Sequence, residues 1–241
     1  MPSIADRLAE TRERIAAAAG RGGRPGAPVR LVAVAKTASA DGLRQAWSAG
    51  QREFGHNRVQ ALAVHQAVLP EAHWHLIGPL QRNKAGDALA LAGTIQTVGD
   101  RRIAERLDRL RAAGGELPPF PVLVQLNLSP EDGRYGCPAE SLPALLEFLA
   151  GLARLEARGL MTLGPQGAGE NRLRRHFAAL KLLAEANAAR GLLPAAPELS
   201  MGMSEDYEIA VEEGATLVRV GRAVFPPVTE REPERPADEP F

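Results

Sequence analysis

The sequence predicts a (β/α)8 barrel, the closed TIM-barrel arrangement of eight parallel strands that alternate with helices. Eight short apolar segments recur along the chain, and an amphipathic helical pattern follows them. Several of these helical patterns stop at a glycine, as at Gly50, Gly114 and Gly214. With 241 residues and 45% hydrophobic content, the chain can fill one large core. An open, doubly wound sheet is the alternative that the same pattern leaves open.

The elements follow one another in a regular order. A leading helix is expected over residues 4–19, with Ser3 as its N-cap and Gly20 as its end. The strand candidates are residues 30–35, 53–55, 74–78, 94–98, 122–128, 156–163, 198–201 and 217–220. The helical patterns include residues 41–49, 101–112, 142–152, 173–189 and 205–213. Residues 1–28 are therefore interpreted as a helix and a Gly/Pro linker, residues 29–226 as the barrel, and residues 227–241 as a polar, Pro-rich tail.

Composition excludes several classes of protein. The 29 basic and 29 acidic residues cancel, which argues against nucleic acid as a partner. The chain contains one cysteine, Cys137, and so forms no internal disulfide, while its start lacks the basic flank and apolar core of a signal peptide. No run of 18 apolar residues is present, which argues against a membrane span. The expected location is the cytoplasm.

A lysine stands where the first strand ends. Among the 29 basic residues only Lys36, Lys84 and Lys181 are lysines, so the chain uses arginine as its ordinary surface cation. The active sites of (β/α)8 barrels lie at the carboxyl ends of the strands, which is where Lys36 falls. Partial burial there by Val32 and Val34 would lower the pKa of the amine and make it a nucleophile toward an aldehyde. The alternative is a lysine that merely extends into water.

The segment after the seventh strand carries small residues and hydroxyl groups. The loops after strands seven and eight commonly bind phosphate in this fold. Ser200 and Met201 lie at that strand end, and the backbone there could present N–H groups to a phosphate. Ser204 reads as an ordinary N-cap, and the acidic residues that follow it would repel a phosphate on the helix axis. A phosphate is therefore expected nearer to Ser200 and Met201.

The eighth strand contains a charged residue among valines. Arg219 faces opposite to Val218 and Val220, so it points either into the barrel or outward toward a helix carboxylate. Gly221 and Arg222 follow and could supply backbone N–H groups that complete a phosphate cup.

Other motifs carry weaker signals. His73 and His75 alternate on a strand, but a metal site lacks a third ligand with suitable spacing. His56 and Asn57 lie at the end of the second strand, at the barrel mouth. His65 and His176 fall in helical patterns as surface or packing residues, residues 164–169 read as a flexible loop, and Cys137 has no adjacent base.

Six motifs in order resemble one family. They are LVAVAKT at 31–37, FGHNRVQ at 54–60, WHLIGPLQRNK at 74–84, GLMTLGP at 159–165, LSMGMSEDYE at 199–208 and VRVGRAVF at 218–225. Together they resemble the YggS/PROSC-type pyridoxal phosphate homeostasis proteins over nearly the whole barrel. The resemblance implies a monomeric barrel of the alanine-racemase N-terminal-domain type that holds pyridoxal 5'-phosphate (PLP).

The resemblance also implies roles for individual residues. It makes Lys36 the Schiff-base lysine and places Arg219 against the pyridine nitrogen of the cofactor. Asn57 falls in a family motif near the cofactor. Four residues fall where the family grips the phosphate, the last three mainly through backbone N–H groups: Ser200, Met201, Gly221 and Arg222.

The chain also departs from the family pattern. His56 replaces a usual Glu, Arg58 an often-found Tyr, and Arg222 an often-found Thr or Ser. A lysine of the loop after strand five is replaced by Arg134, whose guanidinium stays protonated and does not readily form an imine. A secondary aldehyde-transfer role of that loop is therefore not expected here.

The function predicted is that of an intracellular PLP carrier and regulator with little or no catalysis, with PLP-dependent apoenzymes as transient partners. An arginine at the ring nitrogen keeps the ring unprotonated, which makes it a poorer electron sink. A PLP-dependent amino-acid racemase or lyase is the alternative, although Tyr135 and Tyr207 occupy no obvious position opposite Lys36 and the second domain of such racemases is lacking. A phosphate-binding barrel with an unrelated substrate is a third possibility.

Overall fold

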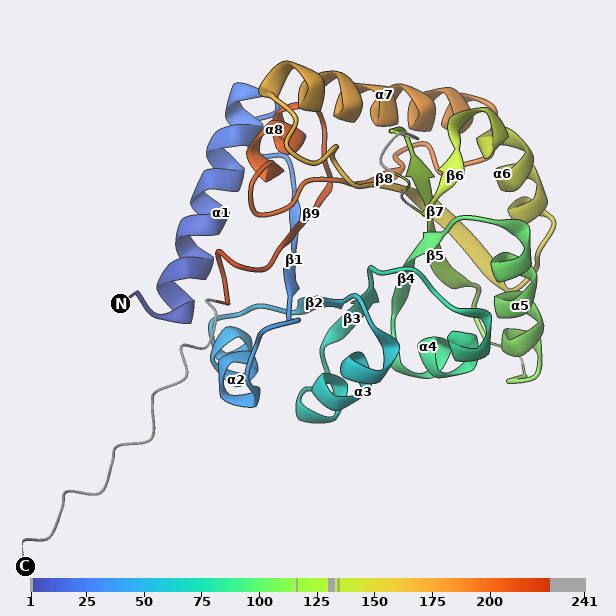
Figure 1. Ribbon diagram of the computed structural model, residues 1–241, viewed down its shortest axis with the longest axis horizontal. Coiled ribbons are helices and arrows are strands. Elements are labelled where there is room, and N and C mark those ends of the chain that lie inside the picture. The colour runs from blue at the N-terminus through green and yellow to red at the C-terminus, as the bar shows by residue number, and fades with distance from the viewer. Residues whose placement is uncertain (1, 116, 130–132, 134, 226–241) are drawn as a thin grey trace, which may run out of the picture.

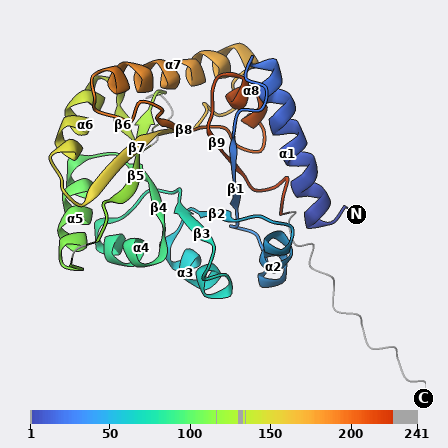
Figure 2. The ribbon, with the colours of Figure 1, turned by 180° about the vertical axis from the view of Figure 1, so that it is seen from behind.

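The computed structural model contains the predicted closed barrel. It describes residues 2–115, 117–129, 133 and 135–225. Eight parallel strands pair in the order β1–β2–β3–β4–β5–β7–β8–β9, and β9 pairs with β1 to close the ring. Figure 1 shows helices surrounding these strands, and Figure 2 shows the same ring from behind. The open-sheet alternative is therefore wrong.

The strands are short and lie close to their predicted positions. Their bounds are β1 (Arg30–Val34), β2 (Glu53–His56), β3 (His73–Leu76), β4 (Thr94–Val98), β5 (Phe120–Asn127), β7 (Leu155–Thr162), β8 (Glu198–Ser200) and β9 (Leu217–Val220). A two-residue strand, β6 (Cys137–Pro138), pairs with β5 outside the ring order. Its brevity explains why the sequence pattern did not reveal it.

The helices form the outer layer. They are α1 (Ile4–Arg21), α2 (Ala40–Ser48), α3 (Val59–Val68), α4 (Ala85–Leu91), α5 (Arg101–Ala112), α6 (Leu142–Ala150), α7 (Glu170–Ala189) and α8 (Tyr207–Glu212). The leading helix α1 packs against both α2 and α8 (Figure 1). Among the described residues no helix follows β9, so α1 occupies the place that an eighth barrel helix would fill.

The ends of α1 follow from local chemistry. The Ser3 hydroxyl accepts a hydrogen bond from the Asp6 N–H, and the Asp6 carboxylate accepts one from the Ser3 N–H, which confirms Ser3 as the N-cap. The helix passes Gly20 and ends at Arg21, with Gly22 as its C-cap. A Cβ on Gly22 would lie 2.6 Å from the Glu212 carbonyl oxygen, so the close approach of α1 to the end of α8 requires glycine there.

The hydrophobic core lies between the strands and the helices. Phe54 on β2 packs against Trp74 on β3 with ring centroids 5.3 Å apart, and both rings are buried. The same layer includes Leu8 of α1 and Phe177 of α7. No helix in the described part of the chain is long and apolar enough to cross a membrane.

Candidate functional site

Lys36 lies two residues beyond β1, at the carboxyl ends of the barrel strands. The register aligns Val220 of β9 with Ala33 of β1, so the residues after β9 run beside the end of β1. A Cβ on Gly221 would lie 3.3 Å from both the Cβ atom and the carbonyl oxygen of Val34. The Lys36 side chain is exposed. Val32 and Val34 are buried, so they do not cover this amine to the extent expected from the sequence.

A hydrogen-bonded turn follows β9. The N–H groups of Val224 and Phe225 both donate to the Gly221 carbonyl oxygen, at 2.9 and 2.8 Å. In such a turn the leading N–H groups, here those of Arg222 and Ala223, have no acceptor within the turn. They lie at the predicted phosphate position, next to the end of β1. The Arg222 guanidinium itself is exposed and paired with Glu205, so the backbone of Arg222 is the group suited to a phosphate.

Ser204 does not cap a helix. The helix α8 begins at Tyr207 with Asp206 at the N-cap position, two residues later than the predicted helix 205–213. The Ser204 hydroxyl instead accepts a hydrogen bond from the Gly221 N–H at 3.2 Å. The cap expected for Ser204 is therefore wrong, because α8 starts after Asp206. The hydroxyl lies beside the turn at 221–225 and joins the loop after β8 to the loop after β9.

Ser200 and Met201 both donate hydrogen bonds to other groups of the barrel. The Met201 N–H donates to the Leu217 carbonyl oxygen at 3.1 Å, and its side chain is buried. The Ser200 hydroxyl donates to Gln96 Oε1 at 2.6 Å inside the barrel. The predicted phosphate contacts by the Met201 N–H and the Ser200 hydroxyl proton are therefore not supported, because these donors already have acceptors. The donors near Gly221 suit that role better.

Arg219 points into the barrel, which decides between its two predicted orientations. Its side chain is 2% exposed. Nη1 donates to the Ser200 hydroxyl at 2.6 Å and Nη2 to the Thr162 carbonyl oxygen at 2.8 Å, and both of these acceptors are uncharged. Burial lowers the pKa of Arg219 to about 10, although the negative charge of Asp206 opposes this shift. The guanidinium is a buried cation whose hydrogen bonds go to neutral oxygens, which suits it to face a ligand acceptor.

The two neighbours at the end of β2 face different ways. Asn57 is exposed at the strand end, close to the mouth. His56 is 3% exposed and lies 5.4 Å from the His65 ring of α3, centroid to centroid. The imidazole therefore packs in the strand–helix layer and does not face the mouth. The replacement of the family's usual Glu by His56 therefore falls at a buried packing position.

The burial of His56 should make folding sensitive to pH. Its desolvation, helped by the nearby His65 and Arg58, lowers the pKa of His56 from 6.5 to about 4. The unfolded chain then binds the proton more readily, so stability is lost as the pH falls from 6.5 through about 4. We expect His56→Phe to reduce this loss by up to about 3 kcal/mol in urea unfolding at pH 7 and pH 4. Identical pH-dependent losses in the two proteins would contradict the assignment.

The remaining candidates have structural roles. His73 Nε2 lies 2.9 Å from Thr94 Oγ1, and the described residues hold no group of three metal-ligating side chains. His176 is buried beside Thr162, with Nε2 3.0 Å from the hydroxyl. Burial raises the pKa of the Cys137 thiol to about 11, which makes it a poor nucleophile. Arg134 lies outside the described residues.

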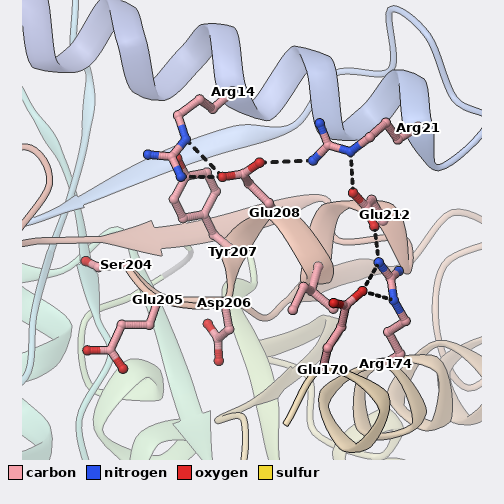
Figure 3. A pocket seen from close by; sticks show the side chains of 11 residues that line it. Arg14, Arg21, Glu170, Arg174, Ser204, Glu205, Asp206, Tyr207, Glu208 and Glu212 are labelled. Atoms are coloured by element: carbon pink, nitrogen blue, oxygen red, sulfur yellow. Dashed lines mark hydrogen bonds and ion pairs between the residues drawn. The ribbon is translucent and has the colours of Figure 1, made fainter.

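A polar cleft outside the barrel is a second place to consider. Figure 3 shows it between α1, α7 and α8. Arg14 pairs with Glu208 at 2.5 Å, Arg21 with Glu212 at 2.6 Å, and Arg174 with Glu212 at 2.5 Å. The arginines of this cleft are already paired with glutamates of the same chain, so little positive charge remains to bind an anion. The ion pairs instead link α1 and α7 to α8.

Comparison with known proteins identifies the family. Residues 7–226 match the family described as alanine racemase, N-terminal domain. The chain is 42% identical over 228 residues to the pyridoxal phosphate homeostasis protein of Pseudomonas aeruginosa PAO1, covering 93% of this chain and 96% of the relative. It is 39% identical over 231 residues to the protein of the same name from Escherichia coli K12, covering 93% and 97%. This chain belongs to the pyridoxal phosphate homeostasis protein family.

Solved structures agree with this family assignment. PipY of Synechococcus elongatus PCC7942, solved with PLP bound, has a TM-score of 0.80 and 37% identity, covering 92% of this chain and all of that one. Alanine racemase of Clostridium difficile 630 has a TM-score of 0.69 at 12% identity, and the match covers 88% of this chain and 59% of the racemase. At that identity the likeness shows the fold alone.

The residues at the mouth of this family member fit PLP chemically. Lys36 is an exposed primary amine, the kind of group that reacts with the aldehyde of PLP. The turn after β9 offers backbone N–H groups for a phosphate, and the buried Arg219 retains donors beyond the two nitrogens already bonded. The sequence pattern indicated phosphate through the hydroxyl groups of this segment but set Ser204 aside as a helix cap, and the structure shows its hydroxyl beside Gly221 instead.

Proposed function

We propose that this protein binds PLP at the mouth of the barrel and acts as a PLP carrier and regulator with little or no catalysis. The observation that carries the proposal is Arg219, a buried cation at the strand ends whose two hydrogen bonds within the described part of the chain go to neutral oxygens. Pyridoxal phosphate is anionic, and its ring nitrogen, when unprotonated, can accept a hydrogen bond from such a donor. The names of the relatives, and PLP in the PipY structure, support the same cofactor.

The residues divide the binding among themselves. Lys36 would bind the aldehyde carbon through Nζ, with loss of water, and Asn57 would lie beside the cofactor. The backbone N–H groups of Gly221 and Arg222, with the hydroxyl of Ser204, would hold the phosphate. The Gly221 N–H donates to Ser204 Oγ, so it would give up that bond to reach the phosphate. Arg219 donates to the ring nitrogen. The binding is therefore shared between β1, β2 and the loops after β8 and β9.

Arg219 also argues for a carrier over an enzyme. When bound, PLP supplies an electron sink for bonds at the α-carbon of an amino acid, and the sink is strongest with a protonated ring nitrogen. The positive guanidinium disfavours a second positive charge at that nitrogen. The protein is proposed to act in the cytoplasm as a monomer, and to pass PLP to apoenzymes transiently.

The racemase or lyase alternative needs a second acid–base group facing Lys36. Tyr135 is hydrogen-bonded to the Gly99 N–H at 3.2 Å, and burial raises its pKa to about 12. The Tyr207 ring lies outside the barrel. The Arg14 Cζ atom of α1 stands over it, 5.6 Å from the ring centroid. The Tyr135 hydroxyl is thus held by the backbone after β4, whereas Tyr207 packs outside the barrel, and no observation among the described residues places either opposite Lys36.

One experiment separates the carrier from the enzyme. Purified protein is titrated with PLP while its visible absorption is followed, and the loaded protein is then incubated with L-alanine in D2O. We expect a new absorption band, and an α-proton exchange rate, measured by NMR, no higher than that with the same concentration of free PLP. Rapid exchange or racemisation would establish an enzyme. Absence of any band would contradict PLP binding itself.

A further inference from the structure

A chain of hydrogen bonds crosses the interior of the barrel from Arg219 to its opposite end. Arg219 Nη1 donates to Ser200 Oγ at 2.6 Å, and Ser200 Oγ donates to Gln96 Oε1 at 2.6 Å. Gln96 Nε2 lies 3.0 Å from His75 Nδ1, and His75 Nε2 lies 3.1 Å from Glu53 Oε2. The first four side chains are at most 2% exposed. Barrel interiors are usually filled by branched apolar side chains, so a continuous polar chain there needs an explanation.

The chain has one direction. At one end the arginine can only donate, and at the other an ionised carboxylate can only accept. Burial raises the pKa of Glu53, but the hydrogen bond from His75 and the charge of Arg30 outweigh it and leave the carboxyl group ionised. Each of the three groups between must therefore accept from the Arg219 side and donate toward Glu53. In this direction His75 accepts at Nδ1 and carries its proton on Nε2.

The direction of the chain determines whether the Ser200 hydroxyl presents its lone pairs or its proton to Arg219. Because Gln96 Oε1 takes the proton of Ser200, the Ser200 oxygen presents lone pairs to Nη1 of Arg219. The second arm of the guanidinium is fixed by the Thr162 carbonyl oxygen at 2.8 Å. If the Gln96 amide were reversed, its NH2 group would point at Ser200, and the serine would need another acceptor for its proton. The orientation of Gln96 thus controls the bonding of Arg219, and His75 and Glu53 control Gln96.

We infer that Gln96, His75 and Glu53 are positioning residues, which set the direction of the Ser200 hydroxyl and thereby hold Arg219 ready for the ring nitrogen of PLP. This inference rests on the proposed function, since Arg219 is the group that would touch the cofactor. None of the three residues needs to contact PLP. The three residues lie on three different strands, so their order along the sequence does not reveal that they are hydrogen-bonded to one another.

The protonation of His75 tests the direction without any cofactor. In the PLP-free protein, the ring nitrogens of the five histidines can be observed by 15N NMR at pH 7, and His75→Gln identifies the His75 signals. We expect a neutral ring with its proton on Nε2 and with Nδ1 accepting a hydrogen bond. A proton on Nδ1, whether or not Nε2 also carries one, would overturn the inference, because Gln96 could then not donate to His75.

A pair of matched variants tests the link to PLP. Gln96→Leu cuts the chain, whereas Gln125→Leu removes another buried glutamine whose Nε2 bonds to the Tyr135 carbonyl oxygen at 2.7 Å. We expect Gln96→Leu alone to weaken PLP binding about tenfold and to shift the visible absorption maximum of the bound cofactor. Gln96→Glu keeps an acceptor for Ser200, so it should retain more of the PLP affinity than Gln96→Leu does.

The outcomes separate the two proposals. Equal loss of PLP affinity in both leucine variants, or unchanged affinity and absorption in a folded Gln96→Leu protein, would overturn the positioning role. Failure of the unmodified protein to bind PLP would instead overturn the proposed function. The His75 measurement would still report the direction of the chain in that case.

Discussion

Replacing Lys36 by alanine is expected to abolish covalent retention of PLP and to weaken total binding by at least about 100-fold, equivalent to about 2.7 kcal/mol. Lys36 is exposed two residues beyond β1, beside the turn that follows β9. The phosphate donors and Arg219 remain in the variant, so weak reversible binding should persist. Equilibrium titration followed by gel filtration measures both forms of binding.

The other two lysines supply the controls for this variant. Lys84 Nζ lies 3.7 Å from Asp87 Oδ2, and Lys181 Nζ lies 3.9 Å from Glu185 Oε1. Each lysine is thus paired with a carboxylate three or four residues further along the chain. Lys84→Ala and Lys181→Ala should retain PLP as the unmodified protein does. Borohydride reduction followed by peptide mass mapping should place the pyridoxyl group on Lys36. A group found only on Lys84 or Lys181 would refute the assignment.

Substitution of Gly78 by alanine is expected to destabilise the fold by about 3 kcal/mol, at the upper end for an overpacked site. A Cβ there would lie 2.2 Å from the Asn57 carbonyl oxygen and 2.8 Å from its carbonyl carbon. These are backbone atoms, so no side-chain rotation can relieve the clash. The Gly78 carbonyl oxygen is also held by the Thr97 hydroxyl at 2.9 Å. The strain should therefore reach Asn57 at the barrel mouth and weaken PLP binding as well.

Gly86→Ala is the matched control, because it makes the same change where space is open. Gly86 lies in α4, and its nearest neighbour to a new Cβ would be Leu110 Cδ1 at 4.0 Å. Alanine in a helix interior is favoured over glycine by up to about 1 kcal/mol. Urea unfolding should thus show effects of opposite sign for the two substitutions. Equal effects would mean that the contact at Gly78 does not limit stability.

Local patterns in the sequence determined much of the architecture. The predicted strands 94–98 and 217–220 and the predicted helix 101–112 coincide with β4, β9 and α5. Alternation and helical periodicity report which face of a segment is buried, and eight repeats of that information predict a closed barrel. The place of Lys36 followed from the same reasoning, because the carboxyl end of every strand in this fold lies at the mouth.

Only the tertiary structure showed which hydrogen-bond partner each buried polar group has. Ser200 and Gln96 are separated by 104 residues, and Arg14 and Glu208 by 194 residues. The same pairing information corrected the role of Ser204, whose partner Gly221 directly follows the next barrel strand, and it showed that α1 closes the ring of helices. Periodicity states that a side chain faces inward but not which side chain lies opposite. That second fact depends on the stagger and closure of all eight strands together, which no single segment encodes.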